Sequence, residues 1–563
     1  MEKKVKEILD NMTIEDKVGQ CLVIGFVGTV LTPKILERIR RIHPAGVRCA
    51  TTMRMKDAMA DPYAYNEERL DRVLRKPQGT VKDFTKGVRS PYTTNEEYCE
   101  LLNTMKRASL ESGAGIPLHI TLDMEGEGGC YQEGGTHYFP SVMGISKSGD
   151  PKLAYEVGWA VAHQVTKVGF SWIHSPVCDV NTNPLNPEIG TRSFGETAKE
   201  ALPYLLESFR GLRDGGLITT GKHFPGRGAS VSDAHKGLPV INLSREEMEE
   251  HLETFKALID EGLPCIMTAH TAYPQLDPSG LPATLSKTIL TDLLKTELGF
   301  KGVITTDDIT MGGIVERFEV KDACIQALNA GADLILFRDE SALVDEVYEE
   351  LVKAAKNGVI REERLNDAVS RTLSVKMQYG LFNDGAIKAV EEAGTGIHNP
   401  KVESIARKAA EKTVFVLKDE ANILPLPRAG KKVLLVEQIH PAHLNTNTTA
   451  CHPSLLWEKM FKYDNQIGGV ETTLDFNEDD QRRVMNRIDD YDIIIITNYY
   501  CRRHSNGNEF VKKLCETQKP VIVVTNCPYS FTVQPEYKSV VISYGVAQES
   551  METVAALLYG EKV

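Results

Sequence analysis

Short runs of apolar residues alternate with longer amphipathic stretches along the first two thirds of the chain. The runs have the length and composition of buried strands, and they lie at Gln20–Phe26, Gly46–Arg48, Pro117–Asp123, Ser171–Asp179, Thr219–His223, Cys265–His270, Val303–Asp307 and Leu334–Phe337. Helical periodicity fills most of the intervals, as at Lys152–Val168, Arg245–Asp260 and Leu285–Leu298. This alternation indicates a parallel sheet, and eight such strands predict a (β/α)8 TIM-like barrel over residues 1–382.

The pattern changes after Gly380-Leu381-Phe382. Residues 383–402 contain glycine, asparagine and aspartate, which is typical of a linker. Runs rich in β-forming residues then resume at Thr413–Leu417, Lys432–Val436, Ile493–Thr497, Val521–Thr525 and Val540–Ser543. They predict a second, smaller doubly wound α/β domain over residues 403–563, and this region carries neither of the glycine-rich nucleotide-binding patterns.

One charge-rich segment, Thr51–Thr94, interrupts the predicted barrel between its second and third strands. It contains Met53, Met55 and several Lys, Arg and Asp residues, but no strong strand pattern. We expect an insertion over the barrel mouth, and both a solvated excursion and a substrate lid are compatible with this composition.

Composition narrows the classes of function. The 563 residues are 42% hydrophobic and 25% charged, as in ordinary globular proteins, and the formal net charge is −13. An acidic surface argues against nucleic acid as the main partner, because phosphate binding needs a basic face. The 11 cysteines show no CxxC pair and no zinc-ligand spacing, which favours free thiols in a reducing compartment. The charged N-terminal segment and the lack of a membrane-spanning run predict a cytoplasmic protein with no membrane partner.

Polar residues cluster where several predicted strands end. Asp123, Lys222-His223, His270 and Asp307-Asp308 all occupy such positions. In a (β/α)8 barrel the carboxyl ends of the strands meet at one rim, where active sites lie. A single polar residue of this kind is as often a cap or a satisfied core group, but four at one rim predict a shared site.

A carboxylate at a rigid strand end suits a nucleophile for glycoside cleavage with retention. Asp307 and Asp308 are near-equal candidates, because adjacent strand residues point to opposite sides and only one can face the barrel axis. The same mechanism needs a group that acts first as acid and then as base.

The loop after Lys222–Gly226 offers such a group. Asp233 and His235 lie two positions apart, so the carboxylate can hold one ring nitrogen and leave the other to exchange protons. Taken alone, this motif is more often a polar pair on a surface loop. Lys222 and His223 are natural donors to sugar hydroxyls, and Arg192 supplies a forked donor or a surface ion pair.

Several segments in fixed order resemble glycoside hydrolase family 3. They are Met12–Gln20, Pro176–Val180, Asn186–Gly195, Lys222–Gly226 with Asp233–His235, Gly299–Met311, Ala330–Asp333 and Lys376–Leu381. The segment from Lys222 to His235 resembles the diagnostic loop of the bacterial β-N-acetylglucosaminidases of that family.

The resemblance implies a barrel followed by an α/β domain and a retaining exo-β-N-acetylglucosaminidase. Terminal β-linked N-acetylglucosamine would come from cell-wall muropeptides or chitooligosaccharides, and the only partner implied is this small carbohydrate, with a homodimer left open. No metal and no organic cofactor is implied. The family's roles fall on Asp307 as nucleophile, His235 oriented by Asp233 as acid/base, and Asp123, Arg192, Lys222, His223 and Met311 as sugar-binding positions.

Three departures from the family pattern concern the substrate. The segment Asp123–Tyr131 lacks the family's downstream arginine, Arg227 and Ala229 stand where the family often has His and Asp, and the insertion is unusually long. Phosphorolysis stays open beside hydrolysis, because a neutral histidine base would not repel phosphate. A β-glucosidase would lack the Lys222–His235 loop, and a non-catalytic sugar-binding module would lose the nucleophile or the dyad. The C-terminal domain is left open between a structural or dimer-forming role and the active-site rim.

Overall fold

The computed structural model describes residues 1–49, 94–126, 136–383, 387–395, 399–440, 454–501 and 507–561. The predicted insertion, apart from Thr94, and the segment after Gly126 that departs from the family pattern lie outside these residues.

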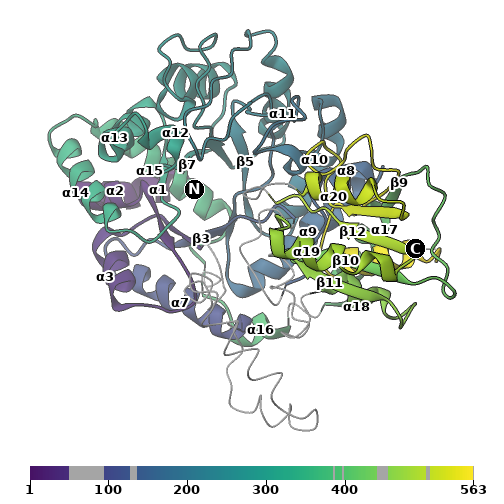
Figure 1. The fold of residues 1–563 in the computed structure, drawn as a ribbon. Coiled ribbons are helices and arrows are strands. Elements are labelled where there is room, and N and C mark those ends of the chain that lie inside the picture. Colours follow the sequence, from purple (N-terminus) through teal and green to yellow (C-terminus); the bar gives the residue numbers. More distant parts are fainter. Residues whose placement is uncertain are drawn as a thin grey trace.

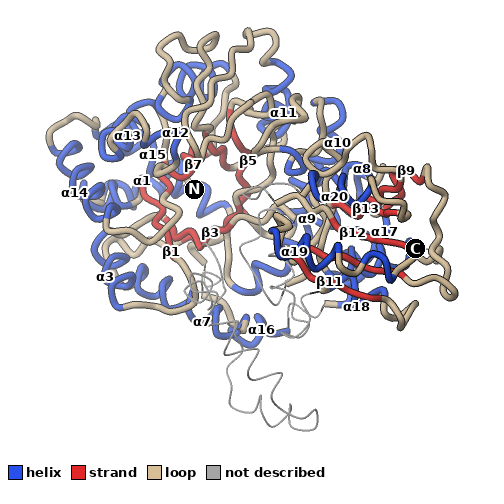
Figure 2. The backbone as a smooth tube through the Cα atoms, in the orientation of Figure 1, coloured by secondary structure: helices blue, strands red, loops and turns tan. Residues whose placement is uncertain are grey.

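Eight parallel strands close into a barrel in the order of the sequence, which confirms the predicted fold (Figures 1 and 2). The strands are β1 (Leu22–Phe26), β2 (Gly46–Cys49), β3 (His119–Leu122), β4 (Trp172–Ile173), β5 (Ile218–Phe224), β6 (Cys265–Thr268), β7 (Val303–Asp308) and β8 (Leu334–Leu336). Strand β4 is much shorter than the predicted run Ser171–Asp179. Pro176 has no N–H for the ladder, and beyond Ile173 the chain pairs again only through the isolated bridge of Val177 with Lys222.

Helices form the outer layer around the strands (Figure 2). They are α1 (Glu2–Asp10), α2 (Ile14–Gly19), α3 (Pro33–Ile42), α7 (Asn95–Leu110), α8 (Val142–Lys147), α9 (Pro151–Val168), α10 (Ala198–Asp214), α11 (Glu249–Asp260), α13 (Val320–Ala330), α14 (Leu343–Lys356) and α15 (Glu362–Gln378). The predicted helix at Leu285–Leu298 is a π-helix, Thr288–Glu297. Local sequence defines several helix starts. Thr94 and Glu97 form a capping box at α7, and Thr32 caps α3 ahead of Pro33.

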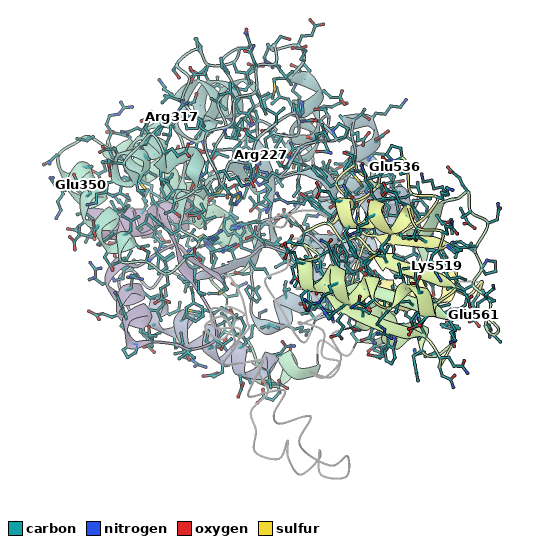
Figure 3. All side chains as sticks on the ribbon, in the orientation of Figure 1. Arg227, Arg317, Glu350, Lys519, Glu536 and Glu561 are labelled. Carbon is teal, nitrogen blue, oxygen red and sulfur yellow. The ribbon has the colours of Figure 1, made fainter. Side chains whose placement is uncertain are left out.

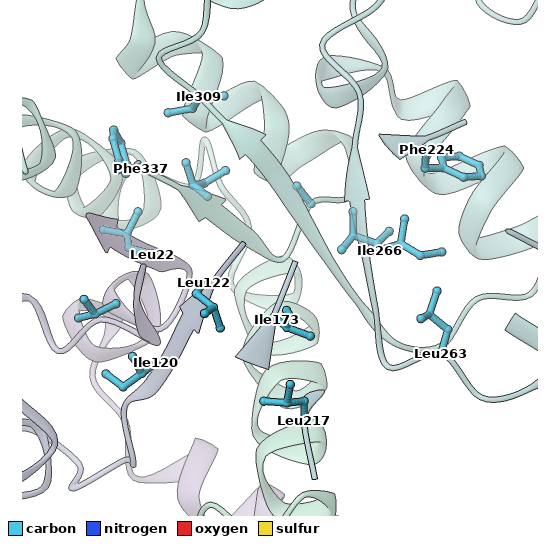
Figure 4. Close-up of a cluster of buried hydrophobic side chains, with 14 of the residues drawn as sticks. Leu22, Ile120, Leu122, Ile173, Leu217, Phe224, Leu263, Ile266, Ile309 and Phe337 are labelled. Carbon is cyan, nitrogen blue, oxygen red and sulfur yellow. The ribbon is translucent and has the colours of Figure 1, made fainter. Parts of the chain in front are cut away.

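Side chains of each barrel strand alternate between two apolar layers. Leu22, Ile173 and Ile266 lie in the layer between strands and helices (Figure 4), whereas Val23 and Trp172 belong to a separate cluster inside the barrel. The same alternation runs along β7, where Val303 faces the barrel interior and Ile304 faces the helices. The register of β7 with β8 shifts between Thr305 and Asp308, so this alternation does not extend to the end of the strand, and the directions of Asp307 and Asp308 follow from their contacts.

The C-terminal domain is a six-stranded sheet with helices on both faces, seen at the right of Figure 1. Its strand order is β11-β10-β12-β13-β14-β9, with β9 antiparallel to β14. The strands are β9 (Phe415–Asp419), β10 (Val433–Gln438), β11 (Gly468–Thr472), β12 (Ile493–Thr497), β13 (Val521–Thr525) and β14 (Ser539–Ile542), and the helices are α18 (Leu455–Met460), α19 (Glu478–Met485), α20 (Asn508–Cys515) and α21 (Gln548–Leu558). Five of these strands match predicted runs. The edge strand β11 was not predicted, because two of its five residues are glycines.

The two domains share apolar contacts. Helix α17 (Pro400–Thr413) contributes Val402 and Ile405 to the barrel's outer apolar cluster, and Met143 of α8 lies in an apolar cluster of the C-terminal domain. The segment predicted as a linker, 383–402, contains α16 (Val390–Thr395) and the start of α17. None of the helices described is long and apolar enough to cross a membrane.

Candidate active site

Asp307 lies at the carboxyl end of β7, on the inner side of the barrel. Its Oδ1 accepts a hydrogen bond from the amide of Asp308 at 2.8 Å, and its Oδ2 lies 3.6 Å from Nη2 of Arg227. Burial alone would raise the pKa of this carboxyl group, but the positive charge of Arg227, with smaller effects from His270 and His235, lowers it below the usual value. Asp307 is therefore an ionised carboxylate with one oxygen directed toward a cation, as a nucleophile requires.

Asp308 has a structural role instead. Its Oδ1 accepts hydrogen bonds from the hydroxyl of Thr310 at 2.8 Å and from the amide of Arg338 at 3.3 Å. His270, a strand-end residue of the predicted site, lies between Thr284 and the Asp308 carbonyl, with ring nitrogens 2.7 and 2.9 Å from their oxygens. These bonds fix the end of β7 and with it the position of Asp307.

Asp233 and His235 form the expected pair. Nδ1 of His235 is 2.7 Å from Oδ1 of Asp233, and the same oxygen accepts the backbone N–H of His235 at 2.9 Å. The double contact fixes the ring with Nδ1 toward the carboxylate and Nε2 pointing away from it. His235 is the more exposed partner, at 27% of its side-chain surface.

The loop that carries His235 packs against the start of α12, the short helix that follows the strand with Asp307. Helix α12 (Gly312–Val315) starts five residues after Asp307, and the amide of Gly313 donates to the carbonyl of Ala234 at 2.8 Å. A Cβ at Gly312 would lie 2.7 Å from the carbonyl oxygen of His235, closer than real Cβ atoms come. Glycine is therefore required for this close approach, and it sets the spacing between the two candidate catalytic groups.

A row of alternating charges crosses the rim beside these groups. It runs Arg48–Asp123–Lys222–Glu125–Arg192 and joins β2, the end of β3, β5 and the loop 181–196. Arg48 and Lys222 bind opposite oxygens of Asp123 at 2.7 and 2.8 Å, and Arg192 binds Glu125 through a forked contact at 2.5 and 3.1 Å. The row holds three cations and two carboxylates, so a net positive charge remains for a neutral or electron-rich ligand.

In this row, the opposite charges change the pKa values of the side chains more than burial does. Burial would raise the pKa of Glu125, but Arg192 and Lys222 lower it to about 2. Burial would lower the pKa of Lys222, yet Asp123 and Glu125 raise it. Each member is thus charged at neutral pH and held in place by the next, which preorganises polar groups of a binding site.

His223 is engaged by the protein on both ring nitrogens. Nδ1 lies 2.6 Å from Oδ2 of Asp179 and Nε2 lies 2.8 Å from Nη2 of Arg227. Because arginine can only donate, Nε2 is the acceptor and Nδ1 carries the proton. Burial lowers the pKa of His223 well below its usual range, which agrees with a neutral ring. This arrangement leaves no ring N–H for a sugar hydroxyl, so the geometry favours an orienting role over the expected sugar contact.

Glu188 and Arg227 connect the dyad with Asp307. Both side chains are almost fully buried, and Nη2 of Arg227 lies 2.8 Å from Oε1 of Glu188. The same Glu188 oxygen is 3.3 Å from Nδ1 of His235. Figure 3 labels Arg227 within the barrel part of the molecule. One ion pair therefore contacts both candidate catalytic groups.

The C-terminal domain anchors the loop that carries Glu188 and Arg192. Tyr529 accepts a hydrogen bond from Asn181 at 3.0 Å and donates to Glu196 at 2.9 Å. Tyr500 donates to the carbonyl of Pro187, the residue before Glu188, at 3.2 Å. These contacts support the position of the rim loop, which is one of the two roles left open for this domain.

Among the described residues, Glu188, Asp233 and His235 form one group whose ligand atoms all lie within 4.8 Å of one another, close enough for a metal ion. The guanidinium of Arg227 already neutralises Glu188, and the dyad contact uses Nδ1 of His235. We therefore interpret the group as a hydrogen-bonded cluster rather than a metal centre.

The structure brings most of the predicted residues to one rim. The charged row contains Asp123, Lys222 and Arg192, and the contacts around Glu188 and Arg227 include Asp307 and the Asp233–His235 pair. Met311 is buried just before α12. Five further residues of the site were not among the predicted site residues: Arg48, Glu125, Asp179, Glu188 and Arg227. Arg48 and Glu125 had a usable signal, because one ends a predicted strand and the other follows Asp123 by two residues.

Known glycosyl hydrolases are similar to this chain in sequence and in fold. The family model described as the glycosyl hydrolase family 3 N terminal domain matches residues 13–375. A β-N-acetylglucosaminidase/β-glucosidase of Cellulomonas fimi is 29% identical over 338 residues, covering 58% of this chain and 59% of that protein. β-Hexosaminidase A of Pseudoalteromonas piscicida is 30% identical over 381 residues, covering 62% of this chain and 63% of that protein.

Among the solved structures that resemble nearly the whole chain is a family 3 enzyme. It is a glycoside hydrolase family 3 β-N-acetylglucosaminidase from a Paenibacillus species, at 25% identity and a TM-score of 0.84, and the match covers 98% of this chain and 97% of the other. The two curated relatives are matched over only 59% and 63% of their length.

The close approach at Gly312 yields a direct test. In Gly312→Ala the added Cβ must displace the carbonyl of His235, 2.7 Å away, and with it the dyad loop. We expect turnover to fall by about 10- to 100-fold, because small misplacements of catalytic groups cost this much. The far-UV circular dichroism should not change. Val315→Ala, at an exposed position of the same helix, is the control, and equal activity in the two variants would contradict the proposed docking.

Proposed function

Because the chain belongs to glycosyl hydrolase family 3, we propose that it is a retaining exo-β-N-acetylglucosaminidase that releases terminal β-linked N-acetylglucosamine. The observation that carries the proposal is the docking of the Asp233–His235 loop onto the start of α12, beside the strand end that directs Asp307 inward. An ionised carboxylate and an imidazole oriented on its Nδ1 side are the two groups that a double displacement requires.

In the first step, Asp307 attacks the anomeric carbon and forms a glycosyl ester. His235, protonated on Nε2, gives its proton to the leaving oxygen. The carboxylates of Asp233 and Glu188, at 2.7 and 3.3 Å from Nδ1, stabilise the imidazolium before the transfer. The ionised state of Asp307 is supported by Arg227, whose charge lowers the pKa of that carboxyl group.

In the second step, neutral His235 takes a proton from water, which attacks the ester and releases the sugar. The sugar hydroxyls would bind the charged row, with Asp123 accepting and Lys222 and Arg192 donating. Met311 would provide an apolar contact near the nucleophile.

The printed functions of the relatives support the sugar assignment. The Cellulomonas fimi and Paenibacillus proteins are described as β-N-acetylglucosaminidases, and the Pseudoalteromonas protein as a β-hexosaminidase. We propose cell-wall muropeptides or chitooligosaccharides as the source of the sugar. None of the nine cysteines described is assigned to a disulfide bond, which suits a reducing compartment, and we propose a cytoplasmic location.

Phosphate is the alternative acceptor, because the proposed base is a histidine. The relatives named above are described as β-N-acetylglucosaminidases or as a β-hexosaminidase, which are hydrolases. We therefore favour water.

A panel of nitrophenyl glycosides tests the proposal. We expect the β-N-acetylglucosaminide to be the best substrate, with free N-acetylglucosamine as product whether phosphate is present or absent. Asp307→Ala should lower turnover by at least about 1,000-fold while Asp308 still holds the strand end. Sugar 1-phosphate as the main product would establish phosphorolysis, and full activity of Asp307→Ala would contradict the assignment of the nucleophile.

The acid role of His235 has a separate signature. In His235→Ala the rate should fall by about 100- to 10,000-fold for poor leaving groups, which need a proton. With a dinitrophenyl leaving group, which needs little protonation, the loss in the first step should be much smaller. Pre-steady-state release of the phenol measures that step. Equal losses for both leaving groups would contradict general-acid catalysis by His235.

A further inference from the structure

We infer that Glu188 and Arg227 form a positioning pair that couples the charge state of the nucleophile to that of the acid/base residue. This inference rests on the proposed function and deepens it, because the steps described above treat the two catalytic groups separately, whereas this ion pair connects them. The pair would act through Asp307 and His235, without touching the sugar.

A single atom is the centre of this arrangement. Nη2 of Arg227 lies 2.8 Å from Oε1 of Glu188, 2.8 Å from Nε2 of His223 and 3.6 Å from Oδ2 of Asp307. Glu188 in turn reaches Nδ1 of His235 at 3.3 Å. A continuous sequence of contacts, Asp307–Arg227–Glu188–His235–Asp233, therefore runs from nucleophile to acid/base.

The position of the pair is fixed by backbone contacts. The amide of Arg227 donates to Oδ1 of Asp179 at 2.7 Å, and Glu188 Oε2 accepts the amide of Ala234 at 3.4 Å. Both side chains are at most 2% exposed, so water screens their charges little. The pair cannot rotate away without breaking contacts to the dyad loop.

The charged and titratable neighbours belong to several elements. On the Asp307 side they are Arg227, His223, His270 and His235, and on the Glu188 side they are Arg227, His235, Asp233, Arg192 and Tyr273. Asp179 contacts the backbone amide of Arg227 and Nδ1 of His223. Nη2 of Arg227 lies within 3.6 Å of a carboxylate oxygen of both Asp307 and Glu188.

The charges that change in the first step explain how this pair would help the reaction. In the first step Asp307 loses its negative charge by forming the ester, and His235 loses its positive charge by giving up its proton. The net charge around Glu188 and Arg227 is therefore the same before and after, so the buried pair needs no reorganisation. Before the first step, the pair stabilises the carboxylate of Asp307 and the imidazolium of His235. In the intermediate, where both of these charges are gone, Glu188 and Arg227 still neutralise each other.

The pair predicts opposite shifts of the two limbs in the pH profile of kcat/KM, which reports on the free enzyme. In Arg227→Met the acid limb should move to higher pH by about 1 unit, because the carboxylate of Asp307 loses its nearest cation. In Glu188→Gln the alkaline limb should move to lower pH by about 1 unit, because the imidazolium of His235 loses a carboxylate.

Two further variants separate charge from structure. Arg227→Lys keeps the positive charge and should return the acid limb most of the way to its original position. Arg38→Met is the matched control, since Arg38 is a buried arginine paired with Asp345 by a 2.6 Å contact between the outer helices α3 and α14. Thermal unfolding of all variants reports any loss of stability.

The profiles are measured with the β-glycoside that the unaltered protein cleaves best. If Arg227→Met and Glu188→Gln lose activity equally at every pH, or if Arg38→Met moves the limbs to the same extent, the coupling role is overturned. A protein that cleaves another sugar in place of the N-acetylglucosaminide would contradict the proposed function, yet the shifts would still test the pair.

Discussion

The candidate site depends on one physical interaction: the carboxylates of Asp123, Glu125 and Asp307 at the rim of the barrel each face a cation. Glu125 is held ionised by Arg192 and Lys222, Asp123 by Lys222 and Arg48, and Asp307 by Arg227. A buried charge without such a partner would be too costly to keep. The pairing therefore explains both why charged residues can gather at this rim and why their positions are so closely defined by one another.

The barrel supplies the positions that this pairing needs. Closure of the sheet brings the carboxyl ends of the strands to one rim, and at the end of β7, after a register shift with β8, two adjacent aspartates make different contacts. Asp307 faces inward, whereas Asp308 holds the strand end through Thr310 and the amide of Arg338. The dyad loop is placed by glycines at the start of α12, and the rim loop of Glu188 is supported by tyrosines of the C-terminal domain. The chemistry thus draws on both domains, although the proposed catalytic groups all belong to the barrel.

Local sequence predicts the strands of the barrel well, because buried parallel strands are continuous apolar runs bounded by turn residues. It predicts β11 poorly, since Gly468 and Gly469 weaken the strand pattern and only part of this edge strand is buried.

Asp307 and Asp308 could not be separated locally, because alternation fixes opposite directions but not which one is inner. The ion pairs were beyond local reasoning: Arg48 and Lys222 lie 75 and 99 positions from Asp123 in the sequence. Glu188 and Arg227 are likewise joined only by the folded barrel. Lys222 and the dyad were found because their motif is contiguous in the sequence.

In the proposed mechanism, Asp307 forms a covalent glycosyl ester, and His235 then delivers the sugar to water. Proton NMR of the first sugar released from a β-glycoside tests this mechanism most directly, because two successive displacements at the anomeric carbon restore its configuration. We expect β-N-acetylglucosamine to appear first and the α-anomer to accumulate only later, by mutarotation. Initial release of the α-anomer would rule out the mechanism, since it would require a single displacement by water with no ester on Asp307.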